Sequence, residues 1–142
     1  MFKREDIVKY INNEPVLYLR RWHLLKTPWF KLYLHKFTAP DLDRDPHDHP
    51  WDSYIFMLKG KYREELYNIK DNVLHLDDIV IRQGPSLRKM PGKTIHKITR
   101  LLSPEVWTIF LCTKKNRDWG FHTKEGWIYW RDYLNDYKVV EG

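Results

Sequence analysis

Residues 47–60 read HDHPWDSYIFMLKG, with two histidines one residue apart and an apolar run that ends at a Lys-Gly pair. Positions i and i+2 of a strand point to the same face, so His47 and His49 present both rings on one side. The run SYIFML favours a strand, and the following Lys59-Gly60 predicts a hairpin into a second strand, KYREELYN. This stretch therefore predicts antiparallel β structure with two candidate metal ligands at its start.

The strand pattern continues on both sides of this stretch. Five further runs rich in β-branched and aromatic residues are separated by Pro- and Gly-containing turns: 15–25, 29–37, 72–83, 93–102 and 105–113. Short strands at nearly regular spacing are typical of an antiparallel sandwich or barrel, so we predict an all-β fold. Before these runs, Ile7, Val8, Tyr10 and Ile11 follow a helical spacing, which predicts one short amphipathic helix over residues 4–13.

Length and composition are consistent with one well-folded domain over residues 1–142, with its barrel core at about 16–113. Hydrophobic residues make up 42% of the chain and aromatic residues 15%, which excludes a disordered protein. The single cysteine, Cys112, rules out an internal disulfide and a thiolate cluster, and we interpret it as a small buried hydrophobe. The start MFKREDIVKY lacks an apolar segment of signal-peptide length, and no run approaches the roughly 18 apolar residues of a membrane span. We therefore expect a cytoplasmic protein without a membrane partner.

The charge is basic but dispersed. The formal net charge is +6, yet the 25 Lys and Arg residues are scattered among 19 Asp and Glu residues, which argues against a nucleic-acid partner. Arginines near a pocket could instead attract an anionic small molecule. The aromatic stretch 117–137 predicts a strap that lays Trp119, Trp127 and Trp130 across the outside of the barrel; closing the pocket mouth or forming a homodimer contact are the alternatives.

A third histidine follows a Pro-Gly turn in MPGKTIH, residues 90–96. An antiparallel barrel brings residues that are distant in sequence together on its inner wall, so His96 can converge with His47 and His49. Three neutral imidazoles suit Fe(II), Zn, Ni, Cu or Mn and leave coordination positions open for a substrate or oxygen. We therefore predict one divalent metal inside the barrel.

On these residues the chain resembles the cupins. The pair His47 and His49 followed by Gly60 is similar to the first cupin motif, and GPSLRKMPGKTIH (84–96) is similar to the second. Together with KLYLHKF, VWTIFL and WGFHTKEGWIYWRDY, the HDHPW motif further resembles a branch of cupin-like proteins from bacteria and their phages. The resemblance implies an RmlC-like jelly roll, a double-stranded β-helix barrel with the metal inside.

Two positions depart from the cupin motifs. Ser53 stands where the first motif has a glutamate, and Arg100 stands where the second has an asparagine. The site is then either a three-histidine centre, as in the similar cysteine dioxygenases, or it takes a carboxylate from elsewhere. With a two-residue loop at Lys59-Gly60, Glu64 shares the inward face of Ser53, as a fourth ligand or a general acid/base, while Glu65 faces out.

Arg100 has the same strand parity as His96. It can therefore line the cavity and bind a carboxylate or phosphate, or form an outward salt bridge. His35 and His75 have no neighbouring ligand at a useful spacing, and we interpret both as structural histidines.

Three functions are compatible with these residues. The first is a metal-dependent enzyme, with Fe(II) as the leading metal and Zn, Ni or Mn as alternatives, that acts as an oxygenase on a small polar or anionic substrate. The second is a metal-free sugar-nucleotide isomerase or epimerase, in which a histidine oriented by Asp48, Asp52 or Glu64 transfers protons. The third is a non-catalytic binding module, since a fold alone establishes no activity.

Overall fold

A computed structural model of the chain describes residues 2–134 and 137–141, the latter by their backbone. The larger sheet consists of β1 (Lys3–Ile11), β2 (Glu14–Lys26), β3 (Phe30–Phe37), β4 (Ser53–Lys59), β7 (Ser86–Met90), β9 (Val106–Thr113) and β12 (Tyr137–Glu141). These strands lie in the order β12-β1-β2-β3-β9-β4-β7, and each neighbouring pair is antiparallel.

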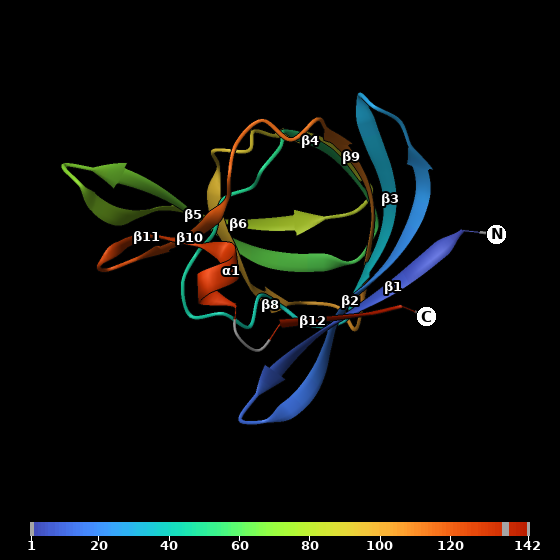
Figure 1. Cartoon of the computed structure of the whole chain (residues 1–142), viewed down its shortest axis with the longest axis horizontal. Helices are drawn as coiled ribbons and strands as arrows, with labels where there is room; N and C mark the ends of the chain where they lie inside the picture. Colours follow the sequence, from blue (N-terminus) through green and yellow to red (C-terminus); the bar gives the residue numbers. More distant parts are fainter. Residues whose placement is uncertain (1, 135–136, 142) are drawn as a thin grey trace.

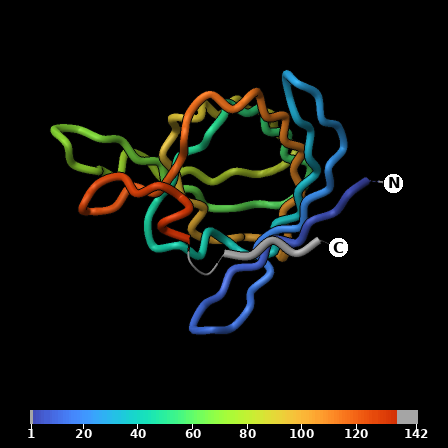
Figure 2. The backbone as a smooth tube through the Cα atoms, in the orientation of Figure 1, coloured from blue at the N-terminus to red at the C-terminus, as the bar shows by residue number. Residues whose placement is uncertain are grey.

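A smaller sheet faces the larger one. It contains β5 (Lys61–Lys70), β6 (Val73–Gln83) and β8 (Ile95–Leu101) in the order β6-β5-β8. The chain then adds a hairpin of β10 (Gly120–Thr123) and β11 (Gly126–Tyr129) and one short helix, α1 (Trp130–Tyr133). Figures 1 and 2 show the strands curving around a central space, with the β5–β6 and β10–β11 hairpins projecting to one side. The predicted all-β jelly-roll barrel is confirmed.

The predicted N-terminal helix is wrong. Residues 3–11 form β1, which pairs with β2 on one side and β12 on the other. Burial alternates along this segment as in a strand, because the side chains of Ile7 and Lys9 are buried whereas that of Val8, between them, is half-buried. Asn12 and Asn13 have φ values of 51° and 65°, which is the pattern of a two-residue hairpin turn. Glu14 then continues directly into β2, so the turn ends a strand and not a helix.

The predicted hairpin at Lys59-Gly60 is also wrong. β4 pairs with β7 and β9, whereas β5 pairs with β6 and β8, so the chain changes sheets at Gly60. Gly60 has φ 107°, and a Cβ atom there would lie 2.7 Å from the carbonyl oxygen of Glu105. A glycine at this corner therefore allows the backbone to turn closely against the next strand. The change of sheets places β4 and β5 on opposite walls of the barrel.

A buried apolar cluster lies where β4 ends and β5 begins. Its members come from both sheets: Ile7, Leu19, Phe37, Met57, Tyr62, Ile98 and Val106. Buried polar side chains adjoin this cluster on both sheets, because His96 lies two residues before Ile98 on β8 and Thr108 lies two residues after Val106 on β9. Within the part of the chain that the structure describes, no helix has the length and apolar character needed to cross a membrane.

Candidate metal centre

Backbone pairing brings the first histidine to the third. The amide of His47 donates to the carbonyl oxygen of His96 at 3.0 Å, and the amide of His96 donates back to His47 at the same distance. Residues that exchange both hydrogen bonds sit directly opposite each other with their side chains on the same face. The segment around His47 thus acts as an added strand beside β8, and strand alternation places His49 on the same side.

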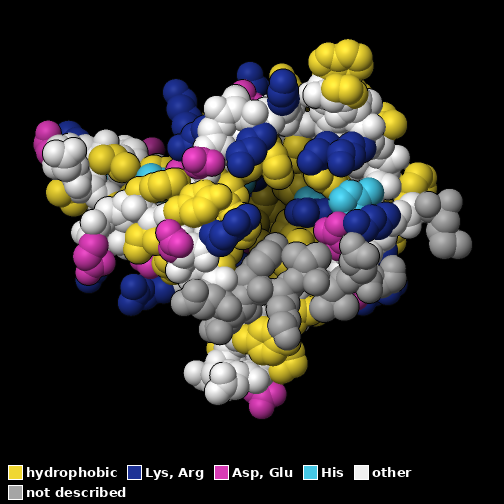
Figure 3. Space-filling view, in the orientation of Figure 1, with side chains coloured by type: hydrophobic (Ala, Val, Ile, Leu, Met, Phe, Trp, Pro, Cys, Tyr) yellow, Lys and Arg dark blue, Asp and Glu magenta, His cyan; other side chains and the backbone are white. Residues whose placement is uncertain are grey.

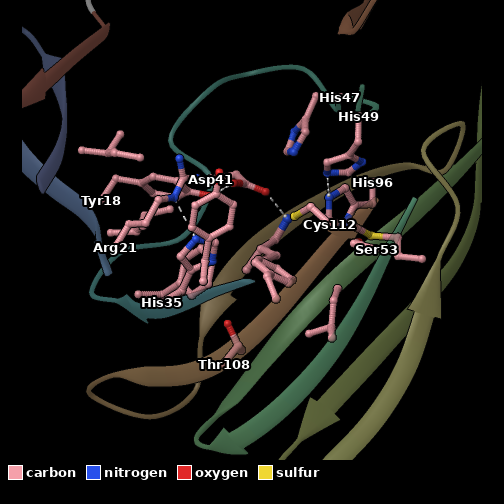
Figure 4. A pocket seen from close by; sticks show the side chains of 18 of the residues that line it. Tyr18, Arg21, His35, Asp41, His47, His49, Ser53, His96, Thr108 and Cys112 are labelled. Carbon is pink, nitrogen blue, oxygen red and sulfur yellow. Dashed lines mark hydrogen bonds between the residues drawn. The ribbon is translucent and has the colours of Figure 1, made fainter. Parts of the chain in front are cut away.

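The three rings meet at one place on the barrel wall (Figure 4). One potential ligand atom from each of His47, His49 and His96 lies within 4.8 Å of the other two. The Nε2 atoms of His49 and His96 are 3.1 Å apart. The ring centroids of His47 are 5.1 Å and 4.8 Å from those of His49 and His96. The predicted convergence of these three side chains is therefore present in the structure.

Asp48, between the two loop histidines, points to the opposite side and is fully buried. Its carboxylate accepts hydrogen bonds from the amide of Gly120 at 2.9 Å, His122 at 2.8 Å, and the side chains of Trp127 and Arg117 at 3.2 Å and 3.3 Å. These bonds attach the β10–β11 hairpin to the outer side of the histidine segment. Asp48 is thus engaged away from the rings of His47 and His49, and it does not orient them.

A close contact with a glycine fixes the loop that carries His49. The amide of His49 donates to the carbonyl oxygen of Gly92 at 2.8 Å, and the amide of Gly92 donates to Asp52 at 2.8 Å. A Cβ atom on Gly92 would lie 2.7 Å from the carbonyl oxygen of Trp51 and 3.0 Å from that of His49. Only glycine lets the two histidine-bearing segments approach this closely without a shift.

Glu64 lies behind His96 and is fully buried. One carboxylate oxygen, Oε2, is 2.5 Å from Nδ1 of His96 and 3.3 Å from Arg88, and the other is 2.9 Å from Arg82. Burial by itself would raise the pKa of Glu64, but the hydrogen bond with His96 and the charges of His96, Arg88 and Arg82 outweigh it and lower the pKa to about 2. Glu64 faces inward, as expected, but both of its carboxylate oxygens are bonded to His96, Arg88 or Arg82. Glu65 faces the other side, where it bonds Arg63 and Tyr67.

The carboxylate fixes which nitrogen of His96 faces the cavity. In the neutral ring, Nδ1–H donates to Glu64, and the lone pair is left on Nε2, opposite His49. Burial also lowers the pKa of His47 to about 3, with Asp41 partly opposing this effect, and lowers that of His49 well below its ordinary value. Both rings therefore stay neutral at physiological pH and keep a lone pair available.

Arg100 lies outside the cavity, contrary to the prediction from strand parity. A β-bulge opposite Arg63 and Glu64 inserts one extra residue, Thr99, so Arg100 pairs with Arg63 and its side chain is exposed. Sequence reasoning missed the inward arginine, Arg88, which lines the cavity and bonds Tyr62 as well as Glu64. Arg88 belongs to a five-residue strand, β7, within what the sequence suggested was a loop, and such a short alternation carries little signal.

The histidines open onto a cavity of about 250 Å³. Figure 3 shows the hollow, with hydrophobic side chains in its depth and Lys and Arg side chains around its rim. Ser53, at the expected glutamate position, lines the cavity with a buried hydroxyl that has no hydrogen-bond partner among the described residues. Part of the predicted C-terminal strap also contributes, because Trp119 and Phe121 line the cavity, whereas Trp127 is 44% exposed.

The donor set fits a divalent metal. Two facing imidazole nitrogens 3.1 Å apart either share one proton or bind one ion, and metal–nitrogen bonds of about 2.1 Å allow ligand nitrogens up to about 4.2 Å apart. The 4.8 Å limit of the whole group is close to that span, so small ring rotations would bring all three nitrogens into range.

The barrel has a cupin-type fold, with the histidine cluster on its inner wall. Fe(II) HppE matches 76% of this chain with a TM-score of 0.53 and 13% identity, and a candidate mannose-6-phosphate isomerase from Ralstonia eutropha JMP134 matches 68% with a TM-score of 0.52 and 14% identity. A cupin superfamily protein from Desulfitobacterium hafniense DCB-2 matches 67% at a TM-score of 0.46 and 13% identity. The matched parts are 56%, 85% and 76% of those chains, so this chain spans about half the length of HppE. No protein-family model and no curated protein matches the sequence. At these identities the likeness concerns the fold.

Proposed function

We propose that this protein is a metal-dependent cupin that holds one divalent ion through His47, His49 and His96 and acts as an oxygenase on a small anionic molecule. The observation that carries the proposal is the convergence of three imidazole rings at the wall of a cavity. Fe(II) is the leading metal, and Zn, Ni or Mn are alternatives that nitrogen ligands also accept. A bound Fe(II) supplies redox chemistry toward dioxygen at coordination positions that the protein leaves open.

The residues around the histidines support this role. Glu64 holds the ring of His96 by its Nδ1–H and so keeps Nε2 directed inward, as carboxylates do for many metal-binding histidines. Arg82 and Arg88 hold Glu64 in turn. The apolar lining excludes water, and the basic rim raises the local concentration of an anionic substrate. The cavity volume lies just below the usual range of about 300–1,000 Å³ for ligand pockets, which favours a small molecule.

Metal analysis tests the proposal directly. The untagged protein, purified from cells grown with added iron, nickel, zinc or manganese, should contain about one divalent ion per chain. His47→Ala, His49→Ala and His96→Ala should each lose the ion, whereas His75→Ala, at an exposed position on β6, should retain it. An ion content that is unchanged in all three variants would contradict the proposed ligands. Oxygen consumption by the iron-loaded protein with a panel of small carboxylic acids then tests the reaction class.

A second function is favoured by the pairing of Glu64 and His96 at 2.5 Å. Without a metal, this carboxylate would orient His96 as a general base whose Nε2 faces the cavity, which is the requirement of an isomerase or epimerase. Undetectable metal after every supplementation would favour this function. A homodimer and a cytoplasmic location stay predictions of the sequence, and gel filtration would test the first.

A further inference from the structure

A second pair of polar side chains lies on the cavity wall formed by β3 and β9. His35 and Thr108 sit directly opposite each other in the register of the two strands, and both are buried, with exposures of 3% and 2%. Both line the same cavity as the histidine cluster. Among the described residues, Nδ1 of His35 and Oγ1 of Thr108 have no hydrogen-bond partner. Buried polar atoms in native proteins are rarely left unpaired, so this pair calls for a ligand.

Arg21 determines what His35 offers to that ligand. Nε of Arg21 donates a hydrogen bond to Nε2 of His35 at 2.9 Å. A guanidinium has donors only, so Nε2 must accept, and the proton of the neutral ring must lie on Nδ1. Burial and then the charge of Arg21 lower the pKa of His35 well below its ordinary value, which keeps the ring neutral. His35 thus presents a buried N–H donor that lacks an acceptor.

Aromatic neighbours hold this ring in place. Phe110 contacts it edge-on with centroids 4.6 Å apart, Phe37 does so at 5.6 Å, and Tyr33 stacks against it at 5.6 Å. Thr108 extends from the adjacent strand, where opposite Cβ atoms are about 4.5–5.5 Å apart. The two donors are therefore fixed close together and oriented before any ligand arrives, which lowers the entropic cost of binding.

The pair is separate from the histidine cluster. Ser53, at the start of β4, pairs with Cys112 on β9. Thr108 lies four residues before Cys112, which is about 13 Å away along the same strand. Figure 4 shows His35 and Arg21 across the pocket from His49 and His96, with Thr108 between these groups and deeper in the barrel. A small molecule bound between the two groups would contact both.

We propose that His35 and Thr108 form a carboxylate-binding subsite, which holds one end of a small substrate whose other end faces His47, His49 and His96. This inference rests on the proposed function for the role of the bound molecule. One N–H and one O–H match the two oxygens of a carboxylate, whereas a phosphate would leave oxygens without donors. The charge of Arg21, behind the ring, favours an anion at this position.

Other charged side chains around the cavity already have protein partners. Lys9 forms an ion pair with Asp43 at 2.5 Å, and Asp41 accepts hydrogen bonds from Tyr18 and from the amide of Ile98. Arg21 has a more distant carboxylate, that of Glu5 at 4.0 Å. A carboxylate at His35 and Thr108 would therefore lie near Arg21, whose charge is the least neutralised by a nearby carboxylate in this wall.

Propanoate serves as the probe, with propanamide as the neutral control of the same shape. Binding is measured by ligand-observed NMR and titration calorimetry on the full chain, both metal-free and metal-loaded. Wild type should bind propanoate in both states and favour it over propanamide. Thr108→Val, which keeps the shape and removes the hydroxyl, should weaken propanoate binding about fivefold to tenfold. His35→Phe should weaken it by at least as much.

The matched control is Thr113→Val on the same strand. Its hydroxyl donates to the carbonyl oxygen of Asp52 and faces away from the cavity, so this variant should lose stability but keep propanoate binding. Thr108→Val should do the opposite, because it removes a hydroxyl that is unpaired in the free protein. A shift of the His35 Nδ1–H proton signal upon addition of propanoate would locate the carboxylate at this ring.

The outcomes separate this inference from the proposed function. Propanoate binding to the metal-free protein that depends on Thr108 and His35 supports the subsite, whatever the metal content. Equal propanoate binding by wild type, Thr108→Val and His35→Phe would overturn the subsite, because the pair would then hold only water. An absence of propanoate binding in the millimolar range would overturn it as well. In both cases a normal metal content would leave the histidine centre intact.

Discussion

His96 and His35 are both buried histidines on the same cavity, yet they offer it opposite chemistry. Nδ1 of His96 is held by the carboxylate of Glu64, so in the neutral ring a lone pair faces the cavity. Nε2 of His35 is held by the guanidinium of Arg21, so a proton faces the cavity. The charge of the partner behind the ring thus decides whether the ring presents an acceptor, which suits a metal, or a donor, which suits an oxygen atom.

The two regions also differ in how they are built. His47 and His49 come from an irregular segment that is fixed by Asp48, Gly92 and a few backbone bonds, whereas His35 and Thr108 lie within paired strands. The histidine cluster therefore depends on long-range polar contacts that single substitutions can break. The wall at His35 depends on strand register, which should tolerate more single substitutions.

The largest expected effect is that of Glu64→Ala. Removal of the carboxylate leaves Arg82 and Arg88 without their buried partner and frees the ring of His96, which should lower the free energy of unfolding by about 3–5 kcal/mol. Metal affinity should fall by about 10–100-fold. Urea unfolding and metal titration measure the two effects. Glu65→Ala, which removes a partly exposed ion pair with Arg63, should cost less than about 1 kcal/mol. Equal stability of the two variants would contradict the bracing role of Glu64.

Gly92→Ala should have the next largest effect, confined to the histidine cluster. The added Cβ would crowd the carbonyl oxygens of Trp51 and His49, which should cost about 1–3 kcal/mol of stability and weaken metal binding. Propanoate binding at His35 should change less than metal binding does. Gly126→Ala is the control, because a Cβ there meets open space and only its positive φ is strained. A variant Gly92→Ala with wild-type metal affinity would show that the loop adapts.

The neutral state of His35 predicts a pH dependence of stability. The unfolded chain takes up a proton at His35 near pH 6.5, whereas the folded chain does not, because burial and Arg21 lower the pKa of the ring. Stability is therefore lost as the pH falls below 6.5, and His35 should account for roughly 2 kcal/mol of the loss between pH 7 and pH 5. Urea unfolding at pH 7 and pH 5 should show that His35→Gln loses roughly 2 kcal/mol less stability than the wild type over this range. The same loss in both proteins would mean that the buried ring accepts a proton.

The smallest expected effect is that of Arg100→Ala. The side chain is exposed outside the cavity, so stability should change by no more than about 0.5 kcal/mol, with unchanged metal and propanoate binding. Arg88→Ala, by contrast, removes a hydrogen-bond partner of Glu64 and Tyr62 and should lower both stability and metal affinity. If Arg100→Ala weakened propanoate binding, the position of Arg100 would need revision.

The sequence predicted what depends on local alternation and missed what depends on pairing between strands. The spacing of His47 and His49 and the Pro-Gly turn before His96 were enough to predict their convergence. The helix over residues 4–13 failed because Ile7 and Val8 suit either period, and only pairing with β2 and β12 decides between them.

Strand register explains the remaining differences between the sequence predictions and the structure. Glu64 does face inward, although the hairpin used to predict it does not exist, because β4 and β5 face each other across the barrel. The bulge at Thr99 turns the side chain of Arg100 from the inner to the outer face of β8, and no local sequence pattern predicts a bulge. His35 was interpreted as structural since no ligand stands near it in sequence; its register partner Thr108 comes from a strand more than seventy residues away.

The aromatic ring of Trp119 lies 6.1 Å from that of His47, and the indole N–H of Trp127 is bonded to Asp48, between the two loop histidines. An event at the histidine cluster therefore changes the surroundings of the Trp119 indole. The protein therefore carries its own optical reporter: its tryptophan fluorescence would follow the loading and emptying of the centre in real time, without a label.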